Sequence, residues 1–221
     1  MDRLIFTAMA SLKQLNNMKL KHANALANAS TVGFKQTFQF ATTTSKVAGA
    51  GYGSRYVPMN RSNDELVIDQ GPLIATGRKL DIYLTGSTLL GVQSPDGQVA
   101  FTRRGDLTVN QAGLMSTANG HVVLAEGGAP ITAPVGVELG ITDDGTVTAI
   151  DPAQPDAPPT IVGNLLLRDA TGIRMVRRID GLYETITAKG KGGDFQGGPN
   201  PPTVQPGSLA VSYTHLRAHE T

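Results

Sequence analysis

The sequence of 221 residues contains no cysteine and no tryptophan. Without Cys, the chain has no disulfide, no thiol nucleophile and no Cys-ligated zinc or iron–sulfur site. Aromatic residues make up 5% of the chain, which is few for a protein that stacks sugars or bases. The 19 Lys and Arg nearly balance the 18 Asp and Glu. This balance argues against nucleic acid as a partner, because phosphate binding needs a clustered basic surface.

Long apolar runs are also missing. No stretch approaches the ~20 apolar residues of a membrane span, and none before Lys13 has the length of a secretory signal core. The default for such a chain is a cytosolic protein, although a protein exported by a machine other than the Sec route looks the same in sequence.

Residues 1–29 contain neither Gly nor Pro. Mainly apolar side chains recur there at steps of three and four, at Leu4, Ala8, Leu12, Leu15, Met18, His22, Ala25 and Ala29. This period predicts a helix. We expect it to stop at Gly33, where a left-handed residue ends the helix and Phe34 packs back on the last turn.

The apolar stripe of this helix is narrow, and it consists of Ala and Met as much as Leu. Such a helix is marginal alone in water, because nucleation is costly and packing normally supplies the stability. The rest of the sequence predicts no partner helix of comparable length. We therefore expect the helix to be partly disordered alone or to fold against other chains, as an assembly helix formed by Leu4, Ala8, Leu12, Leu15, Met18, Ala25, Leu26 and Asn28.

From residue 65 onward the pattern is that of strands. Short runs rich in Val, Ile, Leu and Thr are separated by turn residues such as Pro95-Asp96-Gly97, Asn119-Gly120 and Asp143-Asp144-Gly145, which is typical of an antiparallel meander, sandwich or small barrel. We expect strands at 89–93, 99–103, 106–109, 114–117, 121–124, 137–141, 146–150, 161–168, 173–176 and 182–187, and an irregular segment at 190–207.

The predicted fold class is therefore mainly β: an antiparallel β-rich domain of sandwich or barrel-like meander type, plus a long helical polymerisation arm at the N-terminus. We divide the chain into a helical assembly segment (1–35), a flexible connector (36–64), a β-rich domain (65–209) and a non-native tail (210–221).

No group of residues has the pattern of a catalytic or metal site. The four His do not share metal-ligand spacing, and the Gly-rich stretch 49–53 lacks the Lys-Ser/Thr pair of a phosphate loop. Asp143-Asp144-Gly145 lacks the alternating ligands of a calcium loop, so a hairpin turn explains it better. The pair Arg103-Arg104 is interpreted as a solvated strand face. We assign no catalytic, cofactor-binding or metal-binding residue, and no small-molecule substrate.

Several stretches resemble a known family. The opening MDRLIFTAM (1–9) and the segment ANALANASTVGFK (23–35) resemble its N-terminal signature, and its β-domain motifs are matched by TGRKLDI (76–82), FTRRGDL (101–107), GLMSTANG (113–120) and ITDDGTV (141–147). On these motifs, residues 1–209 resemble the flagellar rod and hook proteins of bacteria. One departure is the segment 85–92, which is less aromatic than in relatives.

The resemblance implies a structural subunit of the proximal part of the basal-body rod, which transmits torque. It also implies export by the flagellar type III apparatus without a cleaved signal peptide, assembly with other rod subunits in the periplasm, and no cofactor. Residues 211–221 depart from the family and match the translation of a sequencing adapter, so we expect the native chain to be longer.

Two other classes stay open from the residues alone. The first is a ligand-binding or phage-tail-like β module with a helical oligomerisation arm. The second is a hydrolase that uses two carboxylates of the β domain, which would need a cleft with these groups roughly 5–10 Å apart.

Overall fold

The computed structural model describes residues 2–27, 32, 37–38, 43–49, 52–59, 65–66, 73–154, 157–187 and 190–210. These residues form one N-terminal helix and a series of short strands, and every strand pair among them is antiparallel. The prediction of a mainly β protein with an N-terminal helix is therefore confirmed.

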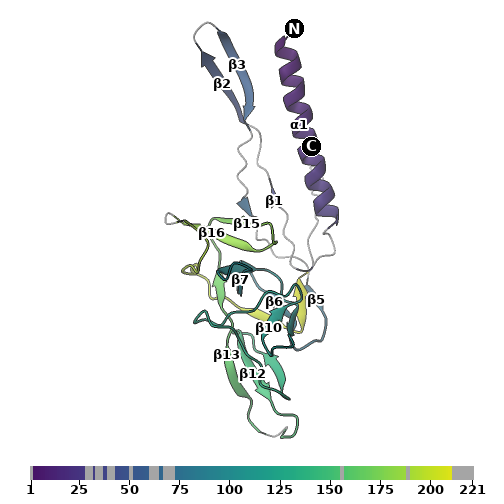
Figure 1. The fold of residues 1–221 in the computed structure, drawn as a ribbon, viewed down its shortest axis with the longest axis vertical. Coiled ribbons are helices and arrows are strands. Elements are labelled where there is room, and N and C mark those ends of the chain that lie inside the picture. Colours follow the sequence, from purple (N-terminus) through teal and green to yellow (C-terminus); the bar gives the residue numbers. More distant parts are fainter. Residues whose placement is uncertain are drawn as a thin grey trace.

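Helix α1 (Asp2–Ala27) has 26 residues and follows the three-and-four period of the sequence. Figure 1 shows it extending away from the β-rich body. The expected stop at Gly33 and Phe34 and the assigned Asn28 lie outside the described residues.

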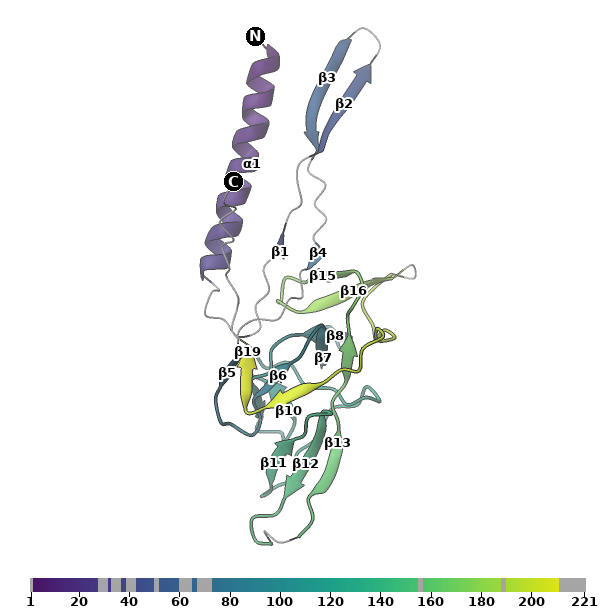
Figure 2. The same cartoon turned by 180° about the vertical axis from the view of Figure 1, so that it is seen from behind.

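Two pairs of strands come between α1 and the body in the sequence. β1 (Thr37–Phe38) pairs with β4 (Glu65–Leu66), and β2 (Thr43–Gly49) forms a hairpin with β3 (Tyr52–Met59). In Figures 1 and 2 this hairpin points in the same direction as α1. The hairpin falls within 36–64, where we expect a flexible connector. The four-part division of the chain stays a prediction.

The body contains one larger sheet and one three-stranded sheet. The larger sheet has the order β14 (Leu167–Asp169), β7 (Thr88–Gln93), β8 (Val99–Thr102), β16 (Tyr183–Thr187) and β15 (Met175–Arg177), and β17 (Gly190–Lys191) pairs with β16. The three-stranded sheet contains β11 (Glu138–Ile141), β12 (Thr146–Ile150) and β13 (Thr160–Asn164).

Three two-stranded pairs complete the body. They are β9 (Leu107–Val109) with β10 (Met115–Thr117), β6 (Ile82–Leu84) with β18 (Val204–Pro206), and β5 (Leu73–Ala75) with β19 (Ser208–Ala210). The last two pairs each join a strand near the start of the body's sequence to a strand near its end. Because they bring distant segments together, the body is not a simple meander.

Most predicted strands and turns are present. Gly97 and Gly145 have positive φ angles of 79° and 84°, as tight hairpin turns require. Two expectations are wrong. The segment 121–124 makes only isolated bridges, and 190–207, expected to be irregular, contains β17 and β18.

The core lies within the body and is almost entirely aliphatic. Its main cluster contains residues such as Leu90, Val92, Leu107, Met115 and Val147, all inaccessible to solvent, and a smaller cluster surrounds Phe101 and Tyr183.

Arg103 is part of this interior, and the prediction that it is a solvated strand residue is wrong. Its side chain donates hydrogen bonds to the carbonyl oxygens of Gly86 (2.7 Å), Thr88 (2.8 Å) and Leu84 (3.0 Å). Burial lowers the pKa of Arg103 to about 10. The guanidinium group therefore ties together the backbone between β6 and β7, at the point where relatives were expected to have a more aromatic segment.

Candidate assembly interface

Large apolar side chains of α1 are exposed to solvent. Six of them have 48–77% of their surface exposed: Met9, Leu12, Leu15, Met18, Leu20 and Leu26. A soluble helix normally buries such a stripe against its own domain. Since each of these large side chains is uncovered, α1 has an unsatisfied apolar surface.

The exposed residues lie on more than one side of α1. At 3.6 residues per turn, Ala8, Leu12, Leu15 and Leu26 fall within an arc of about 60°. Met9 and Leu20 lie about 20° from one another, roughly 60° or more beyond this arc. We call the first set the leucine face (Ala8, Leu12, Leu15, Leu26) and the second the flanking face. The surface is therefore broader than the narrow stripe expected.

The sequence prediction missed Met9 and Leu20. They are eleven residues, or about three helical turns, apart. This spacing puts them on the same side of the helix and could have identified them from the sequence. Of the assigned residues, Ala8, Leu12, Leu15, Met18 and Leu26 are exposed on α1. Leu4 and Ala25 lie on α1, but their side chains are outside the described part of the structure.

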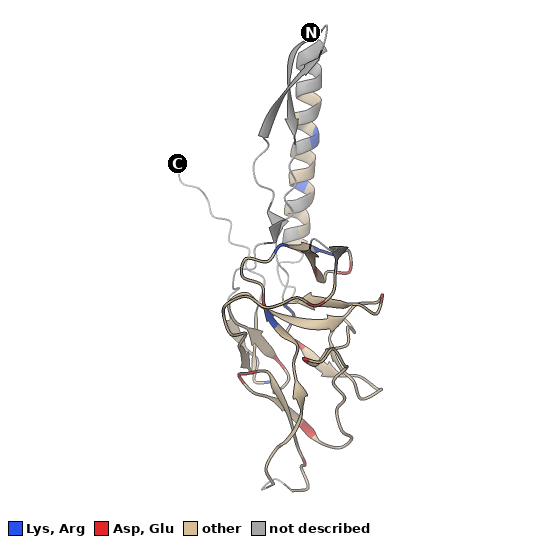
Figure 3. Cartoon of the chain, turned by 90° about the vertical axis from the view of Figure 1, so that its left-hand side faces the viewer, with Lys and Arg blue, Asp and Glu red and all other residues tan. Residues whose placement is uncertain are grey.

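Charge on α1 is of one sign beyond its first turn. The helix contains Arg3, Lys13, Lys19 and Lys21, and its one acidic residue is Asp2. Lys13 and Lys19 are exposed, and Figure 3 shows basic positions along the helix. A partner of α1 must therefore tolerate or neutralise positive charge.

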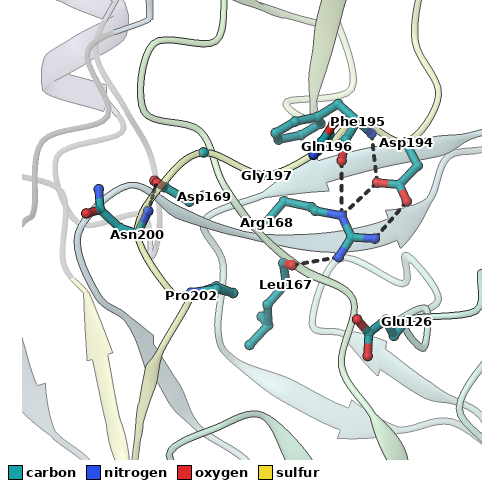
Figure 4. Close-up of a pocket in the computed structure, with 11 residues that line it drawn as sticks. Glu126, Leu167, Arg168, Asp169, Asp194, Phe195, Gln196, Gly197, Asn200 and Pro202 are labelled. Carbon is teal, nitrogen blue, oxygen red and sulfur yellow. Dashed lines mark hydrogen bonds and ion pairs between the residues drawn. The ribbon is translucent and has the colours of Figure 1, made fainter.

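The body has a surface hollow of about 590 Å³, lined by Glu126 and by residues of β14 and of the segment 194–202. Figure 4 shows how its polar groups bind one another. The guanidinium of Arg168 pairs with the carboxylate of Asp194 at 2.9 Å and donates to the carbonyl of Phe195 at 3.1 Å.

Asp169, also in this hollow, accepts hydrogen bonds from the backbone N–H and the hydroxyl of Thr171 and from the N–H of Asn200. Burial raises the pKa of Asp169, but these hydrogen bonds outweigh burial and hold the pKa below its usual value. The carboxylates of Asp169 and Asp194 therefore fasten the segment 194–200 to β14. This use of both groups explains the hollow without a ligand.

Within the residues that the structure describes, no three His, Asp or Glu side chains converge as a metal site would require. The described part of the chain also contains no helix that is long and apolar enough to cross a membrane. Among the described residues, the exposed large apolar side chains of α1 form the most distinctive candidate interface.

Comparison with known proteins places the chain in a family. Residues 83–149 match the family model described as the flagellar hook protein FlgE/F/G D1 domain. Flagellar basal-body rod protein FlgF of Salmonella typhimurium is 38% identical over 189 residues, which cover 86% of this chain and 73% of the relative. FlgF of Escherichia coli is 36% identical, with 83% and 71% covered. FlgG of Buchnera aphidicola (subspecies Schizaphis graminum), also a basal-body rod protein, is 29% identical, with 80% and 72% covered. The chain therefore belongs to the FlgF family of flagellar basal-body rod proteins.

Proposed function

We propose that this chain, a structural subunit of the flagellar basal-body rod, joins the rod through α1 and transmits torque through the contacts that α1 makes. The observation that carries the proposal is the set of exposed large apolar side chains on α1. Burial of apolar surface is the main driving force of protein association, so these side chains favour contact with neighbouring subunits.

The two faces of α1 imply more than one neighbour. One straight helix covers a single stripe of another helix, so a partner on the leucine face leaves Met9 and Leu20 uncovered. We propose that a second neighbour covers this flanking face. A helix that packs against neighbours on two sides transmits a lateral load to both of them, as a rod that transmits torque requires.

The proposal includes the way in which the subunit reaches the rod. We propose that the flagellar type III apparatus exports it without a cleaved signal peptide, and that α1 remains exposed until other rod subunits cover it in the periplasm. The expected division into an assembly segment (1–35), a connector (36–64) and a β-rich domain (65–209) belongs to this proposal, as do the assigned residues Leu4, Ala25 and Asn28.

The experiment is the double variant Leu12→Asp with Leu15→Asp in the full-length protein. Because Leu12 and Leu15 are exposed in the single chain, the variant body should stay folded. Two buried carboxylates in the assembled interface are costly, so we expect loss of rod assembly and of swimming. The matched control is Leu12→Met with Leu15→Met, which keeps an apolar surface of similar volume and should support swimming. Normal swimming of the Asp variant would contradict the proposal.

A further inference from the structure

Two parts of the body carry opposite charge. The segment 138–164, which contains β11, β12 and β13, has five Asp or Glu and no Lys or Arg. The segment 174–191, which contains β15, β16 and β17, has five Lys or Arg against two Asp or Glu. We call these segments the acidic unit (138–164) and the basic unit (174–191).

The two units lie at opposite ends of the body. Figures 1 and 2 show β12 and β13 at the end farthest from α1, and β15 and β16 at the end that faces α1. The body therefore has an acidic end and a basic end along the long axis of the molecule.

The acidic unit has an uncovered sheet face. The register pairs Glu138 with Ile150 and Thr148 with Ile161, so these four side chains share one face. Their strand neighbours Leu139 and Val147 are buried on the other face. On the uncovered face, 68% of the Ile161 side chain and 37% of Ile150 are exposed.

Negative charge borders this apolar face. Glu138 is exposed and pairs with Lys79 at 2.6 Å. Asp151, directly after β12, is exposed, and no ion pair of the described residues involves it. The Asp151 carboxylate accepts the N–H of Ala153 at 2.9 Å, so the face combines branched apolar side chains with a carboxylate that no cation neutralises within the described residues.

The basic unit offers the complementary combination. Ile179, in the turn between β15 and β16, is fully exposed, and Ile186 is 45% exposed. Arg174 is exposed and takes part in none of the ion pairs of the described residues. Because Ile179 is fully exposed, its side chain buries no apolar surface within the described part of its own chain.

The turn that carries Ile179 is held in place. The guanidinium of Arg178 pairs with the carboxylates of Asp96 (2.6 Å), Asp180 (3.0 Å) and Glu184 (3.5 Å). The N–H of Gly181 donates to the carbonyl of Arg178 at 3.1 Å. Because the turn is ordered before any contact, docking of Ile179 loses little conformational freedom.

We propose that the basic unit of one copy docks on the acidic unit of a second copy, with Ile179 and Ile186 against the face that carries Ile150 and Ile161. This contact rests on the proposed function, and it lies in the body, separate from α1. Since it joins two different surfaces, each copy leaves one surface open for the next, so copies continue in a row rather than close as a dimer. The opposite charges select this pairing over contact between two like ends.

The chain contains no cysteine, so disulfide cross-linking tests the contact directly. Full-length Ile179→Cys and full-length Ile161→Cys are mixed under conditions that support rod assembly and then oxidised. We expect cross-linked dimers in the mixture and little product from either variant alone. A double variant with both cysteines should give a ladder of longer products. Rods that assemble from these variants without a mixed cross-link would overturn the proposal.

Charge exchange provides a second readout. Asp151→Lys or Arg174→Glu alone should lower the yield of the mixed cross-link roughly tenfold or more, because like charges then face each other across the contact. The two changes together should restore it. The matched control is Glu126→Lys, an exposed acidic position outside both units, which should leave the yield unchanged. Equal yields for all four proteins would overturn the proposal. If only the Leu12 and Leu15 variant loses assembly, the proposed function stands and this contact does not.

Discussion

Replacement of Arg103 by Met should destabilise the body by a predictable amount. Three hydrogen bonds from a charged donor to carbonyl oxygens are lost, at about 1.5–3 kcal/mol each. Against this loss, the variant no longer buries a charge. The lowering of the Arg103 pKa to about 10 corresponds to about 3 kcal/mol. The net destabilisation is therefore about 2–6 kcal/mol, which lowers Tm by about 5–20 °C for a domain of this size.

Thermal unfolding of the full chain, followed by the circular dichroism of the β-rich body, measures this effect. Arg174→Met is the matched control, because Arg174 is exposed and surface changes stay within about 0.5 kcal/mol. Arg103→Lys keeps the charge but loses the planar fork that reaches three carbonyls, so its Tm should fall as well. A Tm of Arg103→Met equal to that of the parent would refute the reasoning, and full stability of Arg103→Lys would show that charge alone suffices.

The remaining predictions concern the body. Gly105→Ala places a Cβ 1.8 Å from the carbonyl oxygen of Ile82, so urea unfolding should show a loss of about 3 kcal/mol or more. Gly127→Ala, with no atom within 4 Å of its Cβ, should be neutral, and equal losses for the two variants would contradict the close approach. Asp169→Asn should lower stability at neutral pH by about 1 kcal/mol. Because the pKa of Asp169 is lowered in the folded state, its contribution is complete above about pH 4 and is lost as the pH falls through the folded pKa. The gap between the Asp169→Asn variant and the parent should therefore close in acid, and a gap independent of pH would count against this role.

Local signals in the sequence predicted local structure. The spacing of apolar residues from Leu4 to Ala25 predicted α1, and the turns at Gly97 and Gly145 predicted the β7–β8 and β11–β12 hairpins. Each of these elements depends on neighbours within about ten residues, so the chain itself carries the information. Pairing between distant strands has no such local signal, which is why β18 in the Gly- and Pro-rich segment was missed.

The sequence also did not predict which side chains are buried. The adjacent residues Arg103 and Arg104 have different surroundings. Arg103 is buried inside the body, whereas Arg104 is less buried and pairs with Asp106. The alternation of faces along a strand separates them, but only the tertiary structure shows which face is covered. Met9 and Leu20 were missed for another reason: the prediction followed one stripe of the helix, from Leu4 to Ala25, and these two residues lie outside it.

The position at which the described chain enters the body has a mechanical consequence for the proposed function. The chain enters the body through β5, and β19 lies beside it, with Leu73 paired to Ala210. Figure 2 shows the two strands side by side. Beyond β5, the N–H of Thr76 donates to the carbonyl of Gly207 at 2.8 Å, and the N–H of Gly207 donates to that of Asp81 at 2.7 Å. A pull along β5 therefore loads this ladder in shear, so that its hydrogen bonds resist together rather than one after another. A two-stranded ribbon alone is marginal in water, but β19 also contacts β6, which belongs to the core. If the proposed function holds, a load that reaches β5 would thus pass directly into the most buried part of the body.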